Sequence, residues 1–329
     1  MSNIIHPNDN NVNSNNSGLI FMGTPEFAVP ILEKLIQSEY RPAAVFCAPD
    51  KPVGRKQILT PPSVKVIAQK YGLPIYQPKD KNELSQMLLA ISHKLIITVA
   101  YGLIFPKEIL DAPEFGCLNI HPSLLPKYRG ASPIQSAILN GDSETGVTIY
   151  KMDTKVDAGP ILAKSKWLIA NSKIITPELS QILSELGAEL LIKTLPDWLA
   201  GKITPTPQDD SLASYTKIIK KEDGQIDWQK SAKEIEQKIR AYTPWPSSFS
   251  QWPMANGEWQ LLKILEAIAI EKDYGKKVGE VFLIDDNNLA IQTGSGALII
   301  KTLQIEGGKP LDAPDFLRGH KEIIGRILK

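Results

Sequence analysis

The segment Asn119–Asp157 constrains the fold of this chain most strongly. It opens with an apolar run, LNIH, that ends at His121, one of only four histidines, and passes directly into the Pro-rich sequence PSLLPKYRG. In an open α/β sheet, the chemistry gathers where a strand ends in a polar residue before a loop. The segment therefore predicts an α/β fold with an active site at this strand end.

The N-terminal part of the chain has the pattern of a mostly parallel, Rossmann-like sheet. The apolar run Leu19–Met22 is followed by a tight turn at residues 23–25 and by EFAVPILEKLI, which has helical spacing. Further buried strands are expected at residues 43–47 and 95–100. A dinucleotide site requires G-x-G-x-x-G at the first turn, where this chain has one glycine followed by Pro25. A nicotinamide dehydrogenase is therefore disfavoured.

Changes in composition predict the domain organisation. Residues 1–17 are rich in Asn and lack periodicity, which predicts a disordered leader. We expect a catalytic domain over residues 18–201 and a Pro-rich linker over 202–214, because that stretch has no apolar period. Short alternating runs separated by polar turns over residues 215–329 predict a small antiparallel, OB-like β-barrel.

Composition narrows the class of protein. The chain is 43% hydrophobic and 22% charged, with a net charge of +1, so contact with a polyanion requires a local basic patch. Cys47 and Cys117 are too few for a disulfide framework or a zinc site, and no metal is expected. No membrane span or signal peptide is recognisable, which favours the cytoplasm. No feature of the sequence requires more than a monomer.

The residue types in the central segment suit acyl transfer. Asn119 and His121 lie two apart on a strand, so both side chains face the same side and their N–H groups can converge on one oxyanion. Asp157 follows the next strand and can orient the histidine or accept a proton. No Ser or Cys is obviously paired with His121, which favours direct attack by an amine. The alternative is a structural histidine, whose ring is hydrogen-bonded at the end of a strand and takes no part in catalysis.

A long basic loop precedes this segment. Residues 50–65 are rich in Pro, Gly, Lys and Arg, and leave no room for a helix before Ser63. A loop of this length inside a compact domain is usually functional or disordered. Arg55 and Lys56 are suited to gripping a phosphate backbone. A solvated basic loop without a ligand is the alternative.

Several motifs together resemble one family. NIHPSLLPKYRGASPIQSAI and DTKVDAGPIL resemble the two signature segments of the folate-dependent formyltransferases. FMGTPEFAV, PDKPVGR, VAYGLI, RAYTPWPSSF and KTLQIEGGKP extend the similarity over residues 18–329 and narrow it to the members that act on tRNA.

The resemblance implies an activity and a site. It implies transfer of the formyl group of 10-formyltetrahydrofolate to the α-amine of initiator methionyl-tRNA. Asn119 and His121 would polarise the formyl oxygen, and Asp157 would assist removal of the amine proton. Arg55 and Lys56 would meet the tRNA. The implied folate-binding residues are Ser123, Leu124, Leu125, Pro126, Tyr101, Gly102 and Leu103.

Two alternatives share parts of this pattern. A formyltransferase for sugar nucleotides or other small molecules would use the same three side chains, but the basic loop and RAYTPWP argue against it. A catalytically silent tRNA-binding protein would keep the fold, but the intact set of Asn119, His121 and Asp157 argues against that.

Overall fold

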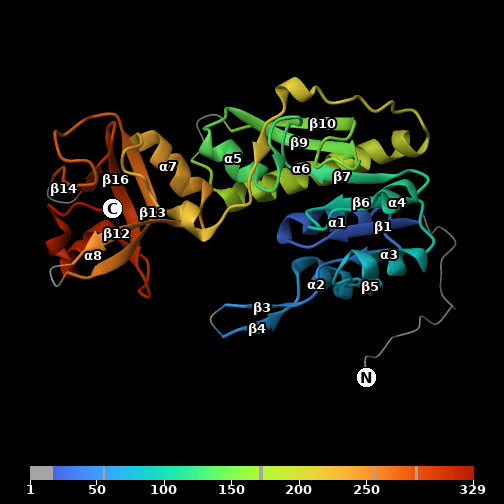
Figure 1. The fold of residues 1–329 in the computed structure, drawn as a ribbon, viewed down its shortest axis with the longest axis horizontal. Coiled ribbons are helices and arrows are strands. Elements are labelled where there is room, and N and C mark those ends of the chain that lie inside the picture. Colours follow the sequence, from blue (N-terminus) through green and yellow to red (C-terminus); the bar gives the residue numbers. More distant parts are fainter. Residues whose placement is uncertain (1–17, 55, 170–172, 255–256, 286–287) are drawn as a thin grey trace. The chain divides into compact units, whose positions relative to one another are not determined.

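A computed structural model describes residues 18–54, 56–169, 173–254, 257–285 and 288–329 (Figure 1). The predicted leader, residues 1–17, and Arg55 lie outside the described residues. The chain forms two compact units that alternate along the sequence. The N-terminal unit comprises the described residues up to Arg129 together with Gly146–Lys166 and Ile182–Ala213. The C-terminal unit comprises Gly130–Thr145, Trp167–Gln181 and Ser214–Lys329.

A seven-stranded sheet, in the order β10-β9-β7-β6-β1-β2-β5, forms the centre of the N-terminal unit. The strands are β1 Leu19–Gly23, β2 Ala44–Phe46, β5 Ile75–Tyr76, β6 Leu95–Val99, β7 Cys117–His121, β9 Glu144–Lys151 and β10 Ile161–Leu168. The pairs β1–β2, β1–β6, β2–β5 and β6–β7 are parallel, and β7–β9 is antiparallel. The predicted mostly parallel sheet is confirmed.

The strand order reverses at β1. The chain leaves β1 for β2 on one side, and later returns to place β6 on the other. Such a switch point opens a crevice at the carboxyl ends of the strands, where α/β proteins bind ligands. Tyr101, in the segment that follows β6, lies close to the end of β1. The Thr24 hydroxyl, just after β1, donates to the Tyr101 carbonyl at 3.5 Å.

Helices cover both faces of this sheet. On one face, α6 (Thr176–Leu199) approaches so closely that a Cβ on its Gly187 would lie 3.0 Å from Ile120 and 3.6 Å from Ile31 of α1 (Val29–Ile36). On the other face, α3 (Lys81–Leu89) and α4 (Lys107–Asp111) bury leucine and isoleucine side chains against Ile20, Ile96 and neighbours. Both faces of the central strands are therefore shielded from solvent.

The basic loop forms a hairpin instead of an irregular loop. β3 (Lys51–Val53) pairs with β4 (Ile58–Thr60) in antiparallel register, and α2 (Ser63–Lys70) begins directly afterwards, as the sequence predicted (Figure 1). Ile58 and Leu59 are 62% and 65% exposed. The hairpin therefore exposes apolar side chains as well as basic ones.

The C-terminal unit contains a curled antiparallel sheet, which confirms the predicted β-rich C-terminal part. Its strands are β12 Ser248–Pro253, β13 Trp259–Ile270, β14 Val281–Leu283, β15 Leu289–Gln292 and β16 Ala297–Ile305, in the order β12-β13-β16-β15-β14, with β17 Leu311–Asp312 on β16. The register of β13 slips near Glu266, and such a bulge bends a strand.

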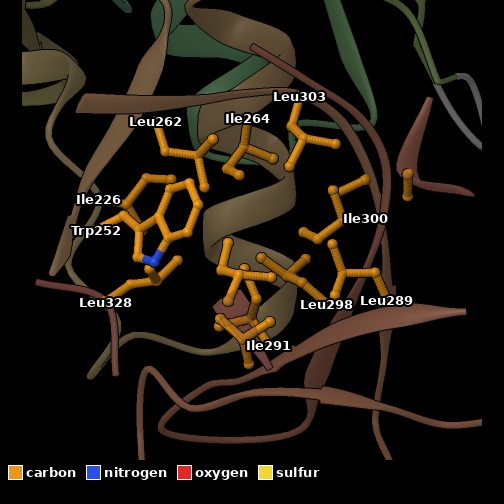
Figure 2. Packing of buried hydrophobic residues seen from close by; sticks show 14 of the residues in the cluster. Ile226, Trp252, Leu262, Ile264, Leu289, Ile291, Leu298, Ile300, Leu303 and Leu328 are labelled. Atoms are coloured by element: carbon orange, nitrogen blue, oxygen red, sulfur yellow. The ribbon is translucent and has the colours of Figure 1, made fainter. Parts of the chain in front are cut away.

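One helix covers the concave side of this sheet. α7 (Ala232–Ala241) begins with a capping box, in which the Ser231 hydroxyl accepts from the Glu234 amide and the Glu234 carboxylate accepts from the Ser231 amide. Apolar side chains from α7 and the strands form one buried cluster that includes Trp252 (Figure 2). Shorter elements complete the fold: α5 Pro133–Leu139, α8 Ala313–Gly319, β8 Arg129–Gly130 and β11 Tyr215–Thr216. None of the described helices could span a membrane.

Candidate active site

Strand β7 delivers the two predicted donors to one face. Asn119 is half-buried and His121 is 5% exposed at the carboxyl end of the strand. Antiparallel pairing with β9 places Tyr150 opposite Asn119 and Thr148 opposite His121. Directly opposed residues point to the same face, so these four side chains share one side of the sheet.

The turn between β9 and β10 brings in the carboxylate. Asp157 Oδ2 lies 3.7 Å from His121 Nδ1, and both side chains are largely buried, at 12% and 6% exposed. Asp157 has φ +51°, in the left-handed region that non-glycine residues seldom occupy. The structure thus brings together Asn119, His121 and Asp157, which are separated by up to 38 positions in the sequence.

A tyrosine that the sequence analysis did not single out joins two members of this group. The Tyr150 hydroxyl accepts a hydrogen bond from Asn119 Nδ2 at 3.0 Å and donates one to Asp157 Oδ1 at 2.7 Å. Burial, together with the Asp157 carboxylate, raises the pKa of Tyr150 well above its ordinary value, so the phenol stays a donor. The only signal in the sequence was its place in the strand after LNIH.

The His121 imidazole is oriented by a hydrogen bond at Nε2, the ring nitrogen that faces away from Asp157. His121 Nε2 lies 2.9 Å from the carbonyl oxygen of Tyr128, an acceptor, so this nitrogen carries a proton and donates it. Nδ1 then faces the Asp157 carboxylate at a separation longer than a hydrogen bond. The arrangement leaves Nδ1 as the ring atom that can meet a substrate.

The loop after His121 is held by hydrogen bonds between side chains and main-chain groups. The Thr148 hydroxyl donates to the Ser123 carbonyl at 2.7 Å and accepts from the Leu125 amide at 3.1 Å. The Ser123 hydroxyl donates to the Lys127 carbonyl at 2.6 Å, and Lys164 donates to the Leu125 carbonyl. Ser123 and Leu125 are buried, whereas the predicted neighbours at positions 124 and 126 are half-buried.

The other predicted folate segment follows β6. Gly102 is exposed, has φ +90°, and a Cβ there would meet nothing within 4 Å. The buried hydroxyls of Thr98 and Tyr101 have no hydrogen-bond partner among the described residues. Leaving such a group unpaired costs roughly 1–3 kcal/mol. Thr98 pairs in register with Asn119, so at least one unpaired hydroxyl neighbours the candidate site.

A cavity of about 310 Å³ opens beside the Asp157 turn. Its lining comes from both sides of that turn and from a later segment: Asp153, Thr154, Lys155, Ala158, Pro160, Pro207, Gln208 and Asp210.

Of the predicted tRNA contacts, Lys56 is exposed in the turn of the β3–β4 hairpin, and Arg55 is not described. No cluster of three or more potential metal ligands occurs in the described part of the chain.

Comparison with known families gives the class of protein. The formyl transferase family model matches residues 17–195, and the model for the formyl transferase C-terminal domain matches residues 218–321. The chain therefore belongs to the formyl transferase family, and it is a formyl-transferring enzyme.

Particular relatives are similar along nearly the whole chain. The methionyl-tRNA formyltransferase of Caldicellulosiruptor saccharolyticus is 44% identical over 94% of this chain and 99% of its own length. The enzyme of the same name from Halalkalibacterium halodurans is 43% identical over 92% and 94%.

Solved structures share the fold at lower identity. An N-formyltransferase from Helicobacter canadensis, in complex with folinic acid and dTDP-3-aminofucose, matches 86% of this chain and 98% of its own, with a TM-score of 0.62 and 21% identity. HypX from Aquifex aeolicus, in complex with tetrahydrofolic acid, matches 93% of this chain with a TM-score of 0.59 and 19% identity. This chain spans about half of HypX, 47%.

Proposed function

We propose that this enzyme transfers the formyl group of 10-formyltetrahydrofolate to the α-amine of initiator methionyl-tRNA. The observation that carries the proposal is the side-chain cluster at the end of β7. Tyr150 is hydrogen-bonded to both Asn119 and Asp157, and the Asp157 carboxylate in turn faces the His121 ring. The names of the relatives that match more than nine-tenths of the chain support the acceptor.

The cluster supplies each step of a direct transfer. The amine nitrogen attacks the formyl carbon, and the carbonyl oxygen becomes an oxyanion that Asn119 Nδ2 stabilises by donating a hydrogen bond. His121 Nδ1 adds a second hydrogen bond when the ring carries a proton on both nitrogens. Asp157 assists removal of the proton from the attacking nitrogen. The bond between the formyl carbon and N10 of the folate then breaks, and N10 takes up a proton. No covalent enzyme intermediate is required.

The co-substrate is proposed to lie at the switch point. The loop formed by Ser123, Leu124, Leu125 and Pro126 would line one side, and the segment Tyr101, Gly102 and Leu103 the other. The support is their position after β7 and β6, whose carboxyl ends adjoin.

The acceptor is proposed to use surfaces away from the chemistry. Arg55 and Lys56, from the basic sequence at residues 50–65, would contact the phosphates of the acceptor end, and residues 215–329 would hold the body of the tRNA. Residues 18–201 would be the catalytic domain and 202–214 the connection between the two domains. We propose that the enzyme acts as a monomer in the cytoplasm, where its acceptor is used.

The decisive experiment supplies 10-formyltetrahydrofolate with one of three acceptors: initiator methionyl-tRNA, free methionine, or an amino-sugar nucleotide. We expect formylation of the tRNA alone. Formylation of only the small molecules would overturn the tRNA assignment and favour a sugar-nucleotide enzyme. Transfer to none of the three would favour a tRNA-binding protein without catalysis.

Two further measurements address the tRNA surface. Phosphate contacts release counterions, so kcat/KM for tRNA should fall steeply as salt rises. Arg55→Ala should weaken use of the tRNA and leave folate binding unchanged. An equal loss of both would make the hairpin a structural element.

A further inference from the structure

The turn that carries Asp157 cannot hold its shape alone. A non-glycine residue in the left-handed region costs on the order of 1–3 kcal/mol and persists only where the surroundings impose it. The turn packs tightly against the end of β9, because a Cβ on Gly159 would lie 1.8 Å from the Lys151 carbonyl oxygen. Its exit is fixed by the Lys151 amide, which donates to the Pro160 carbonyl at 2.9 Å.

A side chain from far along the sequence binds the middle of this turn. Gln208 Nε2 donates to the carbonyl oxygens of Asp157, at 2.9 Å, and of Gly159, at 2.8 Å. The segment that carries Gln208 is itself in register with β10, because Thr206 and Ile161 exchange both main-chain hydrogen bonds, at 2.8 and 2.9 Å. The amide therefore reaches the turn from a fixed backbone.

A buried arginine sets the orientation of that amide. Arg129 is 2% exposed, and its Nε and Nη2 donate to Gln208 Oε1 at 3.1 and 2.9 Å. Nη2 also donates to Asp210 Oδ1 at 2.8 Å. A guanidinium group has only donors, so it can hydrogen-bond only the oxygen end of the amide. The nitrogen end is thereby directed at the turn.

We propose that Gln208, oriented by Arg129, is a positioning residue that holds Asp157 toward the His121 imidazole during formyl transfer. The inference rests on the proposed role of Asp157. Gln208 does not touch the reacting atoms; it acts through the backbone of the turn, so its loss changes the alignment of the carboxylate and not the affinity for either substrate.

The test uses a substitution that changes the donor and little else. Gln208→Glu keeps the length of the side chain and the contact with Arg129, but places an oxygen where the amide hydrogens met two carbonyls. We expect kcat to fall about tenfold, with KM for tRNA and for folate within twofold and the melting temperature preserved. Thr206→Ala, an exposed side chain on the same segment, is the matched control and should behave as wild type.

A second readout does not depend on which acceptor is used. The NMR signals of the His121 ring should shift in Gln208→Glu and stay in place in Thr206→Ala, because the nearby carboxylate moves only in the first variant. Wild-type kcat together with an unchanged ring signal would overturn the inference. A wild-type enzyme that does not formylate tRNA, with a shifted ring signal in Gln208→Glu, would overturn the proposed acceptor and retain the positioning role.

Discussion

The two sheets of this molecule bury their strands differently. In the N-terminal unit, β1 and β6 are buried at every position, because helices cover both faces. In the C-terminal unit, β12 alternates between buried and half-buried residues, because only one face meets the apolar cluster. A strand buried on both faces has few positions for polar side chains, so its carboxyl end is the favoured place for chemistry. β7 carries His121 at its end, and Asn119, two residues earlier, is the half-buried position of that strand.

The buried polar groups of the two units serve different purposes. In the N-terminal unit, several of them bind one another at the site, as Tyr150 does with Asp157. In the C-terminal unit the Trp228 indole donates to the Ser250 hydroxyl, which donates to the carbonyl of Lys329 and so ties the end of the chain to the sheet. Substitutions should therefore separate into those that cost activity and those that cost stability.

The largest expected effect is on the C-terminal core. Trp252 is fully buried in the apolar cluster, beside Ile226 and Leu328 (Figure 2). Trp252→Ala should lower the free energy of unfolding by about 3–5 kcal/mol, measured by denaturant titration. Trp259→Ala, at a site 49% exposed, is the control and should cost under about 1 kcal/mol. Equal costs would mean that the cluster does not govern stability here.

The next effect concerns catalysis. His121→Ala should lower kcat roughly 100-fold or more, as the loss of an oxyanion donor does, while the melting temperature changes little. Single-turnover formylation measures this directly. His93→Ala, in the same unit, should retain activity. Near-normal turnover of the His121 variant would exclude the imidazole from the reaction.

A smaller effect is expected from the bridging phenol. Tyr150→Phe removes the hydroxyl that joins Asn119 to Asp157 and should lower kcat about tenfold, because both side chains lose an orienting partner. Tyr76→Phe, on edge strand β5, provides the matched comparison and should leave kcat unchanged. Loss of stability without loss of kcat would assign Tyr150 to the core alone.

The last effect appears at alkaline pH. Burial raises the pKa of Cys117 to about 12 and that of Cys47 to about 11, from ordinary values of 9. Above pH 9 the unfolded thiols lose protons that the folded ones keep, so stability falls as pH rises. Cys117→Ala should flatten that fall by up to about 1.4 kcal/mol per pH unit between pH 9 and 11.

Both cysteines lie in the N-terminal unit, so alkaline unfolding should begin there. Hydrogen exchange of the two units at pH 9 and above measures the order. Parallel stability curves for wild type and Cys117→Ala would contradict the assignment of the slope to this thiol.

Local pattern was enough to predict the sheet of the N-terminal unit and the strand end that carries the site. The run LNIH predicted both the strand and the polar residue at its end. The turn at residues 23–25 has one glycine, which argued against a dinucleotide site. The C-terminal strand β12 and helix α8 were not predicted. β12 contains only six residues next to two prolines, and α8 offers a single turn of apolar spacing.

The partners of the site depend on tertiary register, which local pattern does not contain. Tyr150 meets Asn119 only because β9 pairs antiparallel with β7 in one register. Gln208 lies in a stretch with no apolar period, which predicted a linker, and it reaches Asp157 across 51 positions. Such a residue looks like any exposed polar side chain until the chain is folded.

The alternation of the two units along the chain limits how this protein can be divided. The C-terminal unit draws its helix α5 from the middle of the sequence, where a Cβ on Gly141 would meet Gln237 of α7 at 2.0 Å. A fragment that starts at Ser214 lacks that helix and leaves α7 without its neighbour. Exchanging the last third of the chain between relatives would therefore give hybrids with a mismatched helix pair, so such modules would have to include residues 130–145.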